Sequence, residues 1–348
     1  MKRVMFLGIV VLVLCLTAQP LWATYQTVVP WSVFENAVSD YSGGVFSPTS
    51  YSRAVSDGGT VYAEVRGSSP TQSWFVKVTD AGTTSMSASV ISNYIGGLTT
   101  GASLGVSGSN LMIASSVTDD VYTINTSGGD LSVYVSKAQL LDQVGGDGFT
   151  TGYSSVDPTG EMVAYETIVD QLVRTNGPGV VEVFLSNGAM VAAMGDAKLQ
   201  GQLAFDGSGN LFVGNTTTDS IWKYDGAALT EAITMEQLIG VTGDTKFGVN
   251  AHIYNPADGL IYLQDLTSRH ILSYDPDDPA GTIKIVMTKE QLENGPLGTA
   301  TLASFSLFGS DIAATGYNKG SMDYVAIPEP ATLCLLGLGG LSLLRRRR

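Results

Sequence analysis

Apolar and polar residues alternate in short runs along the middle of the chain, and these runs recur at a nearly constant interval. The clearest example is DGSGNLFVGN, which begins at Asp206 and combines a Gly-rich turn with a half-buried β-strand. Related decads begin at Ser56, Val106, Asp157, Asp206, Pro256 and Leu307. Their starts are 50, 51, 49, 50 and 51 residues apart, which predicts an internal repeat present six times.

A second strand-like segment follows each decad. Four of these segments begin 14 residues after their decad, and they are DVYTINT, SIWKYDG, HILSYDP and SMDYVAI. SWFVKVT begins at Ser73, and VVEVFLS begins at Val180, where we expect an insertion around TNGPG to delay the strand. Because the segments are β-branched and aromatic with polar alternation, each repeat is predicted to hold several neighbouring strands.

A short helix is predicted near position 30 of the repeat. SKAQLL at Ser136, TMEQLI at Thr234 and TKEQLE at Thr288 place Ser or Thr three residues before Gln. This is the pattern of a capping box, in which the hydroxyl and the Gln side chain each accept a hydrogen bond from a free backbone N–H. A degraded version, SNGAMV, begins at Ser186. We therefore interpret EQL as a helix start and not as a binding motif.

Repeats of about 50 residues with several strands each predict the blades of a propeller. GSGNLFV followed by SIWKYD resembles the blades of NHL-type and gluconolactonase-type six-bladed propellers, and the likeness covers most of residues 25–327. The predicted fold class is therefore all-β, a six-bladed β-propeller over residues 24–327 with short inter-blade helices.

The sixth repeat ends at Ile327 without an outer strand and helix. YQTVVPWSVFENA, near the start of the chain, matches the missing part, with a strand at 27–29 and a capping box at 32–35. Residues 25–36 are therefore predicted to complete the last blade and close the ring, which removes exposed sheet edges.

The first 23 residues have the pattern of a secretory signal peptide. MKRVMFLGIVVLVLCLTAQPLWA combines a basic start, an apolar run and a small residue at Ala23. A lipoprotein signal that uses Cys15 and an uncleaved anchor are the alternatives. Leu14 is too large for a lipoprotein cleavage site, so we favour cleavage after Ala23.

The last 21 residues, 328–348, combine Pro-Glu-Pro, a 14-residue apolar run and four arginines. A complete membrane span needs about 20 apolar residues, so this run is a marginal transmembrane helix held by cytoplasmic arginines. The three parts in this order resemble the PEP-CTERM sorting signal, carried here by Pro328, Glu329, Pro330, Arg345, Arg346, Arg347 and Arg348.

This resemblance implies a partner and a destination. Exosortase, a membrane protease-transferase of bacteria that make an extracellular polysaccharide matrix, is expected to recognise and cut the tail. The protein would be anchored transiently in the inner membrane and would then reach the cell surface or the extracellular matrix.

The charge and the positions of the cysteines exclude some functions for the predicted propeller, residues 24–327, which we call the body. The formal net charge is −14, and without the six basic residues of the two ends 12 basic residues stand against 32 acidic ones. Such a body is repelled by nucleic acid, which we exclude as a partner. The two cysteines, Cys15 and Cys334, lie in the end segments. The body therefore has no disulfide, cysteine zinc site or cysteine nucleophile.

No catalytic constellation emerges from the body. GxSxG, HExxH, phosphate-loop and EF-hand patterns are absent from the sequence. His252 and His270 lie 18 residues apart, and we favour packing or surface roles over a metal pair. DPDDPAG at 275–281 could hold calcium weakly through oxygen ligands, but a solvated turn is the favoured interpretation.

The decads end at equivalent positions, which carry Val65, Ser115, Glu166, Asn215, Asp265 and Gly316. Gluconolactonase-type propellers hold a metal in the central channel, so the resemblance implies that Glu166, Asn215 and Asp265 could bind Ca²⁺. In NHL-type blades the Asp or Asn here satisfies backbone groups of the next turn, and we favour this role.

The sequence thus predicts an exported binding or structural propeller that needs no cofactor. Its expected partners are extracellular polysaccharide or other envelope components. A metal-dependent hydrolase or lactonase is the alternative function, and the sequence favours it less because it provides no acid–base pair of defined spacing.

Overall fold

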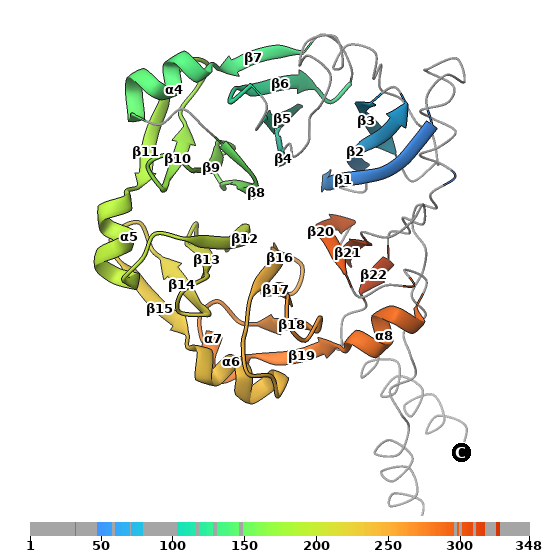
Figure 1. Ribbon diagram of the computed structural model, residues 1–348, viewed down its shortest axis with the longest axis vertical. Helices are drawn as coiled ribbons and strands as arrows, with labels where there is room; N and C mark the ends of the chain where they lie inside the picture. The colour runs from blue at the N-terminus through green and yellow to red at the C-terminus, as the bar shows by residue number, and fades with distance from the viewer. Residues whose placement is uncertain are drawn as a thin grey trace, which may run out of the picture.

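The structure is a computed structural model that describes residues 32, 47–57, 60–69, 71–78, 103–115, 118–127, 131–145, 149–295, 298, 301–308, 311–316 and 325–327. These residues form six antiparallel sheets, arranged as blades around a central axis (Figure 1). The predicted β-propeller body is confirmed.

Four sheets have four strands, and the strands of each sheet follow one another along the chain. The strands are β4 (Ser103–Ser107), β5 (Asn110–Ala114), β6 (Val121–Asn125) and β7 (Ser132–Val135); β8 (Phe149–Val156), β9 (Met162–Glu166), β10 (Gln171–Thr175) and β11 (Val181–Leu185); β12 (Leu199–Phe205), β13 (Leu211–Asn215), β14 (Ser220–Tyr224) and β15 (Leu229–Ile233); β16 (Val249–Asn255), β17 (Leu260–Asp265), β18 (Ile271–Tyr274) and β19 (Lys284–Met287).

The first and last sheets have three strands each among the described residues. They are β1 (Ser47–Asp57), β2 (Thr60–Ser69) and β3 (Thr71–Val78); β20 (Leu302–Phe308), β21 (Asp311–Gly316) and β22 (Val325–Ile327). The helices are α4 (Lys137–Val144), α5 (Asn187–Met194), α6 (Met235–Thr242), α7 (Pro279–Thr282) and α8 (Lys289–Asn294).

The first strand of every sheet lies next to the axis. Each of these inner strands contacts the inner strands of both neighbouring sheets, and β20 contacts β1. The six sheets therefore form a closed ring, in which β1, β4, β8, β12, β16 and β20 surround the centre (Figure 1).

The predicted decads supply the turn after the inner strand and then the second strand of each sheet, which are β2, β5, β9, β13, β17 and β21. The prediction that an insertion delays the third strand of the third sheet is wrong. QLVRT forms the third strand, β10, and VVEVFLS forms the fourth strand, β11. TNGPG makes the turn between them, where the Asn176 N–H donates to the Val180 carbonyl at 3.0 Å. The strand β10 was missed because Gln171 and Arg174 interrupt its apolar pattern, whereas the apolar run of VVEVFLS is longer and more regular.

The capping predictions are confirmed. Ser136, Thr234 and Thr288 each begin a helix with a complete capping box. Ser186 begins α5 and accepts a hydrogen bond from the Ala189 N–H alone, since no Gln stands at that position. Helices α4, α5 and α6 contact the outer strands β11, β15 and β19 of the following sheets. Each helix therefore joins two consecutive blades at the rim.

The hydrophobic core lies between the blades. Each of five clusters combines buried residues of two adjacent sheets; one, for example, joins Val163 and Leu172 of the third sheet to Leu203, Leu211 and Val213 of the fourth. Both faces of a sheet must therefore be apolar, which explains the runs of fully buried residues in β9 and β13.

Three predicted segments lie outside the described residues: the signal peptide 1–23, the sorting tail 328–348 and most of the closing segment 25–36. Within the closing segment, Ser32 is helical and exposed. In the part of the chain that the structure describes, no helix is long and apolar enough to cross a membrane.

Candidate functional site: the central channel

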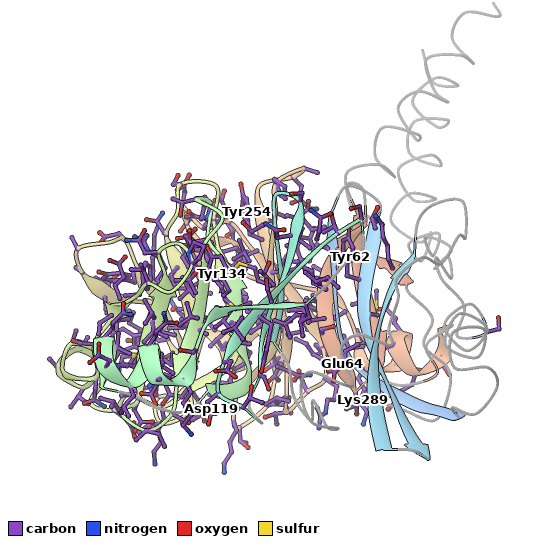
Figure 2. All side chains as sticks on the ribbon, turned by 90° about the horizontal axis from the view of Figure 1, so that it is seen from above. Tyr62, Glu64, Asp119, Tyr134, Tyr254 and Lys289 are labelled. Carbon is purple, nitrogen blue, oxygen red and sulfur yellow. The ribbon has the colours of Figure 1, made fainter. Side chains whose placement is uncertain are left out.

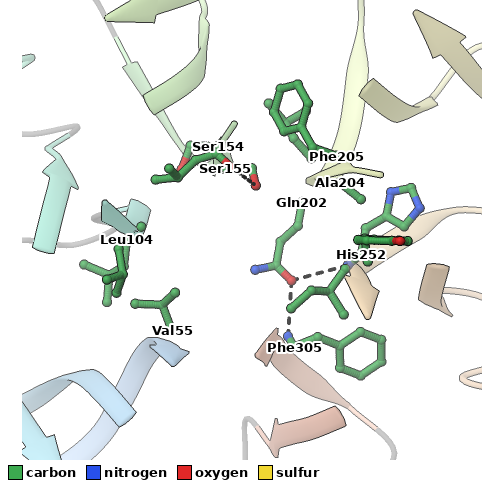
Figure 3. Close-up of a pocket in the computed structure, with 15 residues that line it drawn as sticks. Val55, Leu104, Ser154, Ser155, Gln202, Ala204, Phe205, His252 and Phe305 are labelled. Carbon is green, nitrogen blue, oxygen red and sulfur yellow. Dashed lines mark hydrogen bonds between the residues drawn. The ribbon is translucent and has the colours of Figure 1, made fainter. Parts of the chain in front are cut away.

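A cavity of about 220 Å³ lies on the propeller axis (Figure 3). It is lined by the inner strands of all six sheets, through residues that include Val55, Leu104, Ser154, Gln202, His252 and Phe305. An inner strand pairs on one side only, so its other edge faces the axis with unpaired N–H and C=O groups. The channel is therefore bordered by backbone that must find partners from other sheets.

The ring has two faces, which we name after what they carry. The hairpin face carries the turns between the first and second strands and between the third and fourth strands, such as 206–210 and 225–228. The helix face carries the turns between the second and third strands, such as 216–219, and the helices α4, α5, α6 and α8. Tyr254 lies toward the hairpin face, and Asp119 and Lys289 lie on the helix face (Figure 2). The cavity is lined by the later residues of the inner strands, so it lies toward the hairpin face.

Gln202 bridges three blades across the channel. Its side-chain Oε1 accepts hydrogen bonds from the backbone N–H of His252 at 3.3 Å and of Phe305 at 3.2 Å. These donors belong to the inner strands β16 and β20, whereas Gln202 belongs to β12. Its Nε2 has no hydrogen-bond partner among the described residues, and Figure 3 shows it turned toward the side of the cavity with Val55 and Leu104.

Other amides satisfy the inner edges nearer the helix face. Gln200 Oε1 accepts from the Val249 N–H at 3.3 Å. Asn250 Nδ2 donates to the Leu302 carbonyl at 2.7 Å and to Gln264 Oε1 at 3.1 Å. The channel wall of the fourth, fifth and sixth blades is therefore held by neutral amides, which leaves the Gln202 amide nitrogen as a free donor in the cavity.

The rest of the lining is uncharged. Ser154 and Ser155 add hydroxyl groups, and the partly buried Val55, Val106 and Val156 add apolar surface, whereas the rings of Phe205 and Phe305 lie in the cores between the blades. None of the lining residues is Asp, Glu, Lys or Arg. Such a cavity offers hydrogen bonds and apolar contact to a neutral ligand but has no carboxylate for acid–base work.

His252 is the lining residue whose side chain could in principle act as a general base, but its environment keeps it from doing so. Its side chain is 2% exposed, and Nε2 lies 2.8 Å from the Tyr274 hydroxyl. Burial lowers the pKa of His252 to about 3, so the ring is neutral at physiological pH. Burial also raises the pKa of Tyr274, so this pair carries no charge.

The metal candidates lie at the opposite end of the blades from the cavity. Asn215 pairs with Leu199 and Asp265 with Val249, the first residues of their inner strands, so both lie at the helix face. Glu166 stands at the same place in the third sheet, opposite Phe149. No shared partner links the three side chains, which end strands in three different sheets.

Each candidate instead caps its own turn. Glu166 accepts from the N–H groups of Ile168 at 2.7 Å and Val169 at 2.9 Å. Asn215 Oδ1 accepts from the N–H groups of Thr217 and Thr218, both at 2.8 Å.

Asp265 accepts three such bonds, from the N–H groups of Gly248 at 3.0 Å, Thr267 at 3.1 Å and Ser268 at 2.8 Å. The turns then end in left-handed residues at equivalent positions, which are Asp119, Asp170, Asp219 and Arg269. These hydrogen bonds agree with the capping interpretation.

The donor set does not fit the channel metal implied by the resemblance. Among the described residues, no three His, Cys, Asp or Glu side chains stand together as metal ligands. His252 is buried beside Tyr274, whereas His270 Nδ1 accepts from the Lys289 N–H at 2.9 Å, so the two histidines do not form a pair. In DPDDPAG, Asp275 and Asp278 accept from N–H groups of their own turn.

A second hollow of about 490 Å³ lies on the outer rim, between β11, α5 and β15. Most of its lining side chains are apolar, among them Phe184, Tyr224 and Leu229, while its Ser186 caps α5. Since no free polar side chain converges there, the channel is the better candidate for a polar ligand.

The sequence did not indicate Gln202, Ser154 or Ser155. The signal that could have found Gln202 is its strand, LQGQLAF, in which two amides flank a glycine within an otherwise apolar run. A strand buried on both faces has no need of two amides, so their presence marks an edge with unpaired backbone.

Comparison with known proteins identifies the tail and the fold. Residues 326–348 match the family model of the PEP-CTERM protein-sorting motif. No curated protein matches the sequence. The solved structures that resemble this one include a protein of unknown function from Bacteroides thetaiotaomicron, with a TM-score of 0.53 and 12% identity over 80% of this chain and 70% of that one.

Two further structures show the same likeness. A catalytically inactive virginiamycin B lyase from Staphylococcus aureus, solved with quinupristin, has a TM-score of 0.50 and 10% identity over 82% of this chain and 86% of the lyase. The calcium-binding protein regucalcin from Agrobacterium tumefaciens has a TM-score of 0.48 and 13% identity over 80% of this chain and 95% of regucalcin. At this identity the likeness shows the fold alone, a β-propeller. The tail motif implies an exported protein that is sorted by exosortase.

Proposed function

We propose that this chain, a β-propeller with a PEP-CTERM tail, is an envelope or matrix protein that binds a neutral, hydroxyl-rich ligand at its channel. The ligand class is the end of an extracellular polysaccharide. The observation that carries the proposal is the uncharged cavity into which Gln202 presents a free amide donor.

The chemistry of the lining supports a sugar as the ligand. A sugar ring has hydroxyl groups at its edge and apolar C–H groups on its faces. Gln202, Ser154 and Ser155 can exchange hydrogen bonds with the hydroxyl groups, and Val55, Val106 and Val156 provide apolar surface. The cavity volume of about 220 Å³ is large enough for one sugar ring.

Binding is favoured over catalysis because the cavity has no group that titrates near neutral pH. General acid–base catalysis is most efficient with such a group, and His252 is held neutral by burial. The metal-dependent hydrolase receives no support from the donor set described above.

A glycan array on the purified body, residues 24–330, tests the proposal with two matched variants. Gln202→Glu keeps the oxygen that accepts from His252 and Phe305 but replaces the free donor with a second carboxylate oxygen. We expect binding to weaken by about tenfold or more, since one lost hydrogen bond is worth ~1 kcal/mol and a buried carboxylate opposes the ligand.

Gln200→Glu is the control, because Gln200 makes the same kind of backbone contact but does not line the cavity. It should bind like the wild type. Equal binding by all three proteins would place the ligand elsewhere, and a wild-type body that retains no glycan would favour a structural role in the matrix.

A further inference from the structure

The sorting motif begins inside the propeller. The matched residues start at 326, and Ala326 is a member of β22, where it pairs with Ala313 of β21. Ile327, the last residue of the strand, pairs with Ile312, and Pro328 follows directly. No spacer therefore separates the last blade from the Pro-Glu-Pro motif.

The direction of β22 decides which face the tail leaves. β22 is antiparallel to β21, and Ile327 lies opposite Ile312, beside the turn that joins β20 to β21. That turn belongs to the hairpin face. The tail thus departs from the face toward which the cavity lies.

The reach from strand to membrane is short. The apolar run begins at Ala331, four residues after Ile327. Four residues span at most ~14 Å, and the headgroup layer on one side of a bilayer takes about 5–8 Å of this. An anchored tail thus leaves blade six less than about 10 Å from the headgroups.

The hairpin face has little attraction of its own for a membrane. Its acidic residues include Asp157, Glu161, Asp206, Asp225, Asp258, Asp275, Asp277 and Asp278, of which Asp157 and Asp206 are buried. Of its basic residues, Lys77 donates to the Thr126 carbonyl, Lys223 donates to the Pro276 carbonyl and Arg174 pairs with Glu182 at 2.6 Å, whereas Lys284 is exposed at the start of β19. Anionic lipid repels such a surface, so only the covalent tail holds it there.

We propose that the hairpin face is the surface that the propeller turns toward the membrane while its tail is anchored, and that cutting the tail opens the cavity mouth to polymers. This inference rests on the proposed sorting by exosortase but not on the identity of the ligand. Before cutting, the mouth faces the bilayer and a polysaccharide cannot reach it. After cutting, the acidic face leaves the membrane and binding can begin.

Cysteine labelling tests this orientation, because the body has no cysteine of its own. The background is the chain without its signal peptide, residues 24–348, which lacks Cys15 and carries Cys334→Ser, anchored in vesicles of phosphatidylcholine and phosphatidylglycerol with the body outside. Ala257→Cys places a thiol on the hairpin face of the fifth blade, and Thr267→Cys places one on its helix face. Both native residues are exposed. The probe is a maleimide that carries a polyethylene glycol chain, and the released form is the same chain ending at Pro330.

We expect the Ala257→Cys variant to react at least about tenfold more slowly when anchored than when released. The Thr267→Cys variant should react equally fast in both forms, and a small maleimide should label both positions at similar rates. A Gly/Ser linker of about 20 residues between Ile327 and Pro328, with an end-to-end distance of roughly 25 Å, should restore fast labelling of anchored Ala257→Cys.

Equal polymer labelling of Ala257→Cys in the anchored and released forms would overturn the inference, as would slow labelling that the linker does not relieve. The experiment needs no exosortase. A failure of sorting in cells therefore leaves this result unchanged, and the two failures are distinguishable.

Discussion

Replacing Asp265 tests whether the side chain that ends the second strand of each of these blades caps the following turn. The Asp265 side chain is fully buried and accepts hydrogen bonds from three backbone N–H groups, those of Gly248, Thr267 and Ser268. Loss of a capping side chain costs about 1 kcal/mol, and a buried N–H left without a partner costs a further ~1–3 kcal/mol. Asp265→Ala should therefore lower the free energy of unfolding by about 3 kcal/mol.

Asp265→Asn is the informative companion variant. Asparagine occupies the equivalent place at Asn215 and there caps two N–H groups with one oxygen. The Asn variant should therefore lose less stability than the Ala variant, about 1 kcal/mol. Asp225→Ala is the control, because Asp225 caps an exposed turn where water can replace it.

Urea unfolding of the body, followed by tryptophan fluorescence, measures all three variants with and without a calcium chelator. We expect the loss in free energy of unfolding to be smallest for Asp225→Ala, larger for Asp265→Asn and largest for Asp265→Ala. The chelator should not change the stability of the wild type. An Asp265→Ala variant as stable as Asp225→Ala would refute the capping argument. A chelator that destabilises the wild type as much as Asp265→Ala does would favour a metal.

Three other predictions concern pH, ring closure and sorting. Because burial lowers the pKa of His252 from 6.5 to about 3, the unfolded chain binds a proton that the folded one does not. Stability that is present above pH 6.5 should then be lost as pH falls toward 3; a His252→Phe variant whose urea midpoint falls between pH 7 and pH 4 as much as that of the wild type would contradict this. Deleting residues 25–36 should expose a sheet edge and cause aggregation or loss of cooperative melting, and a truncated body that melts like the full one would show that the ring closes otherwise. Mass spectrometry of surface protein should find chains cut near Pro-Glu-Pro, and mature protein that retains Arg345 to Arg348 would rule out processing.

The features predicted correctly from the sequence are those set by residues close together along the chain. A turn followed by a buried strand, as in DGSGNLFVGN, needs only its own glycines and its own alternation, and the capping box of Thr234 and Gln237 spans one helical turn. The constant interval between such units then predicted the ring, because repeats of this size bury their faces only against one another.

The features missed depend on contacts between blades. Gln202 is recognisable as a channel residue only when β16 and β20 are placed beside β12, 50 and 103 residues away along the chain. β10 was overlooked for a different reason. In a sheet covered on both sides, a strand as short as QLVRT lacks the alternation that marks half-buried strands, and only its neighbours β9 and β11 define it.

The most direct test of the proposed binding role is a crystal structure of the body, residues 24–330, grown with the monosaccharide or short glycan that the array selects. The account predicts one sugar ring in the axial cavity, with a hydroxyl group within hydrogen-bonding distance of Gln202 Nε2 and its C–H face against the apolar side chains of Val55 and Val106. A sugar bound instead in the rim hollow beside Phe184 and Tyr224, with the axial cavity empty, would contradict it.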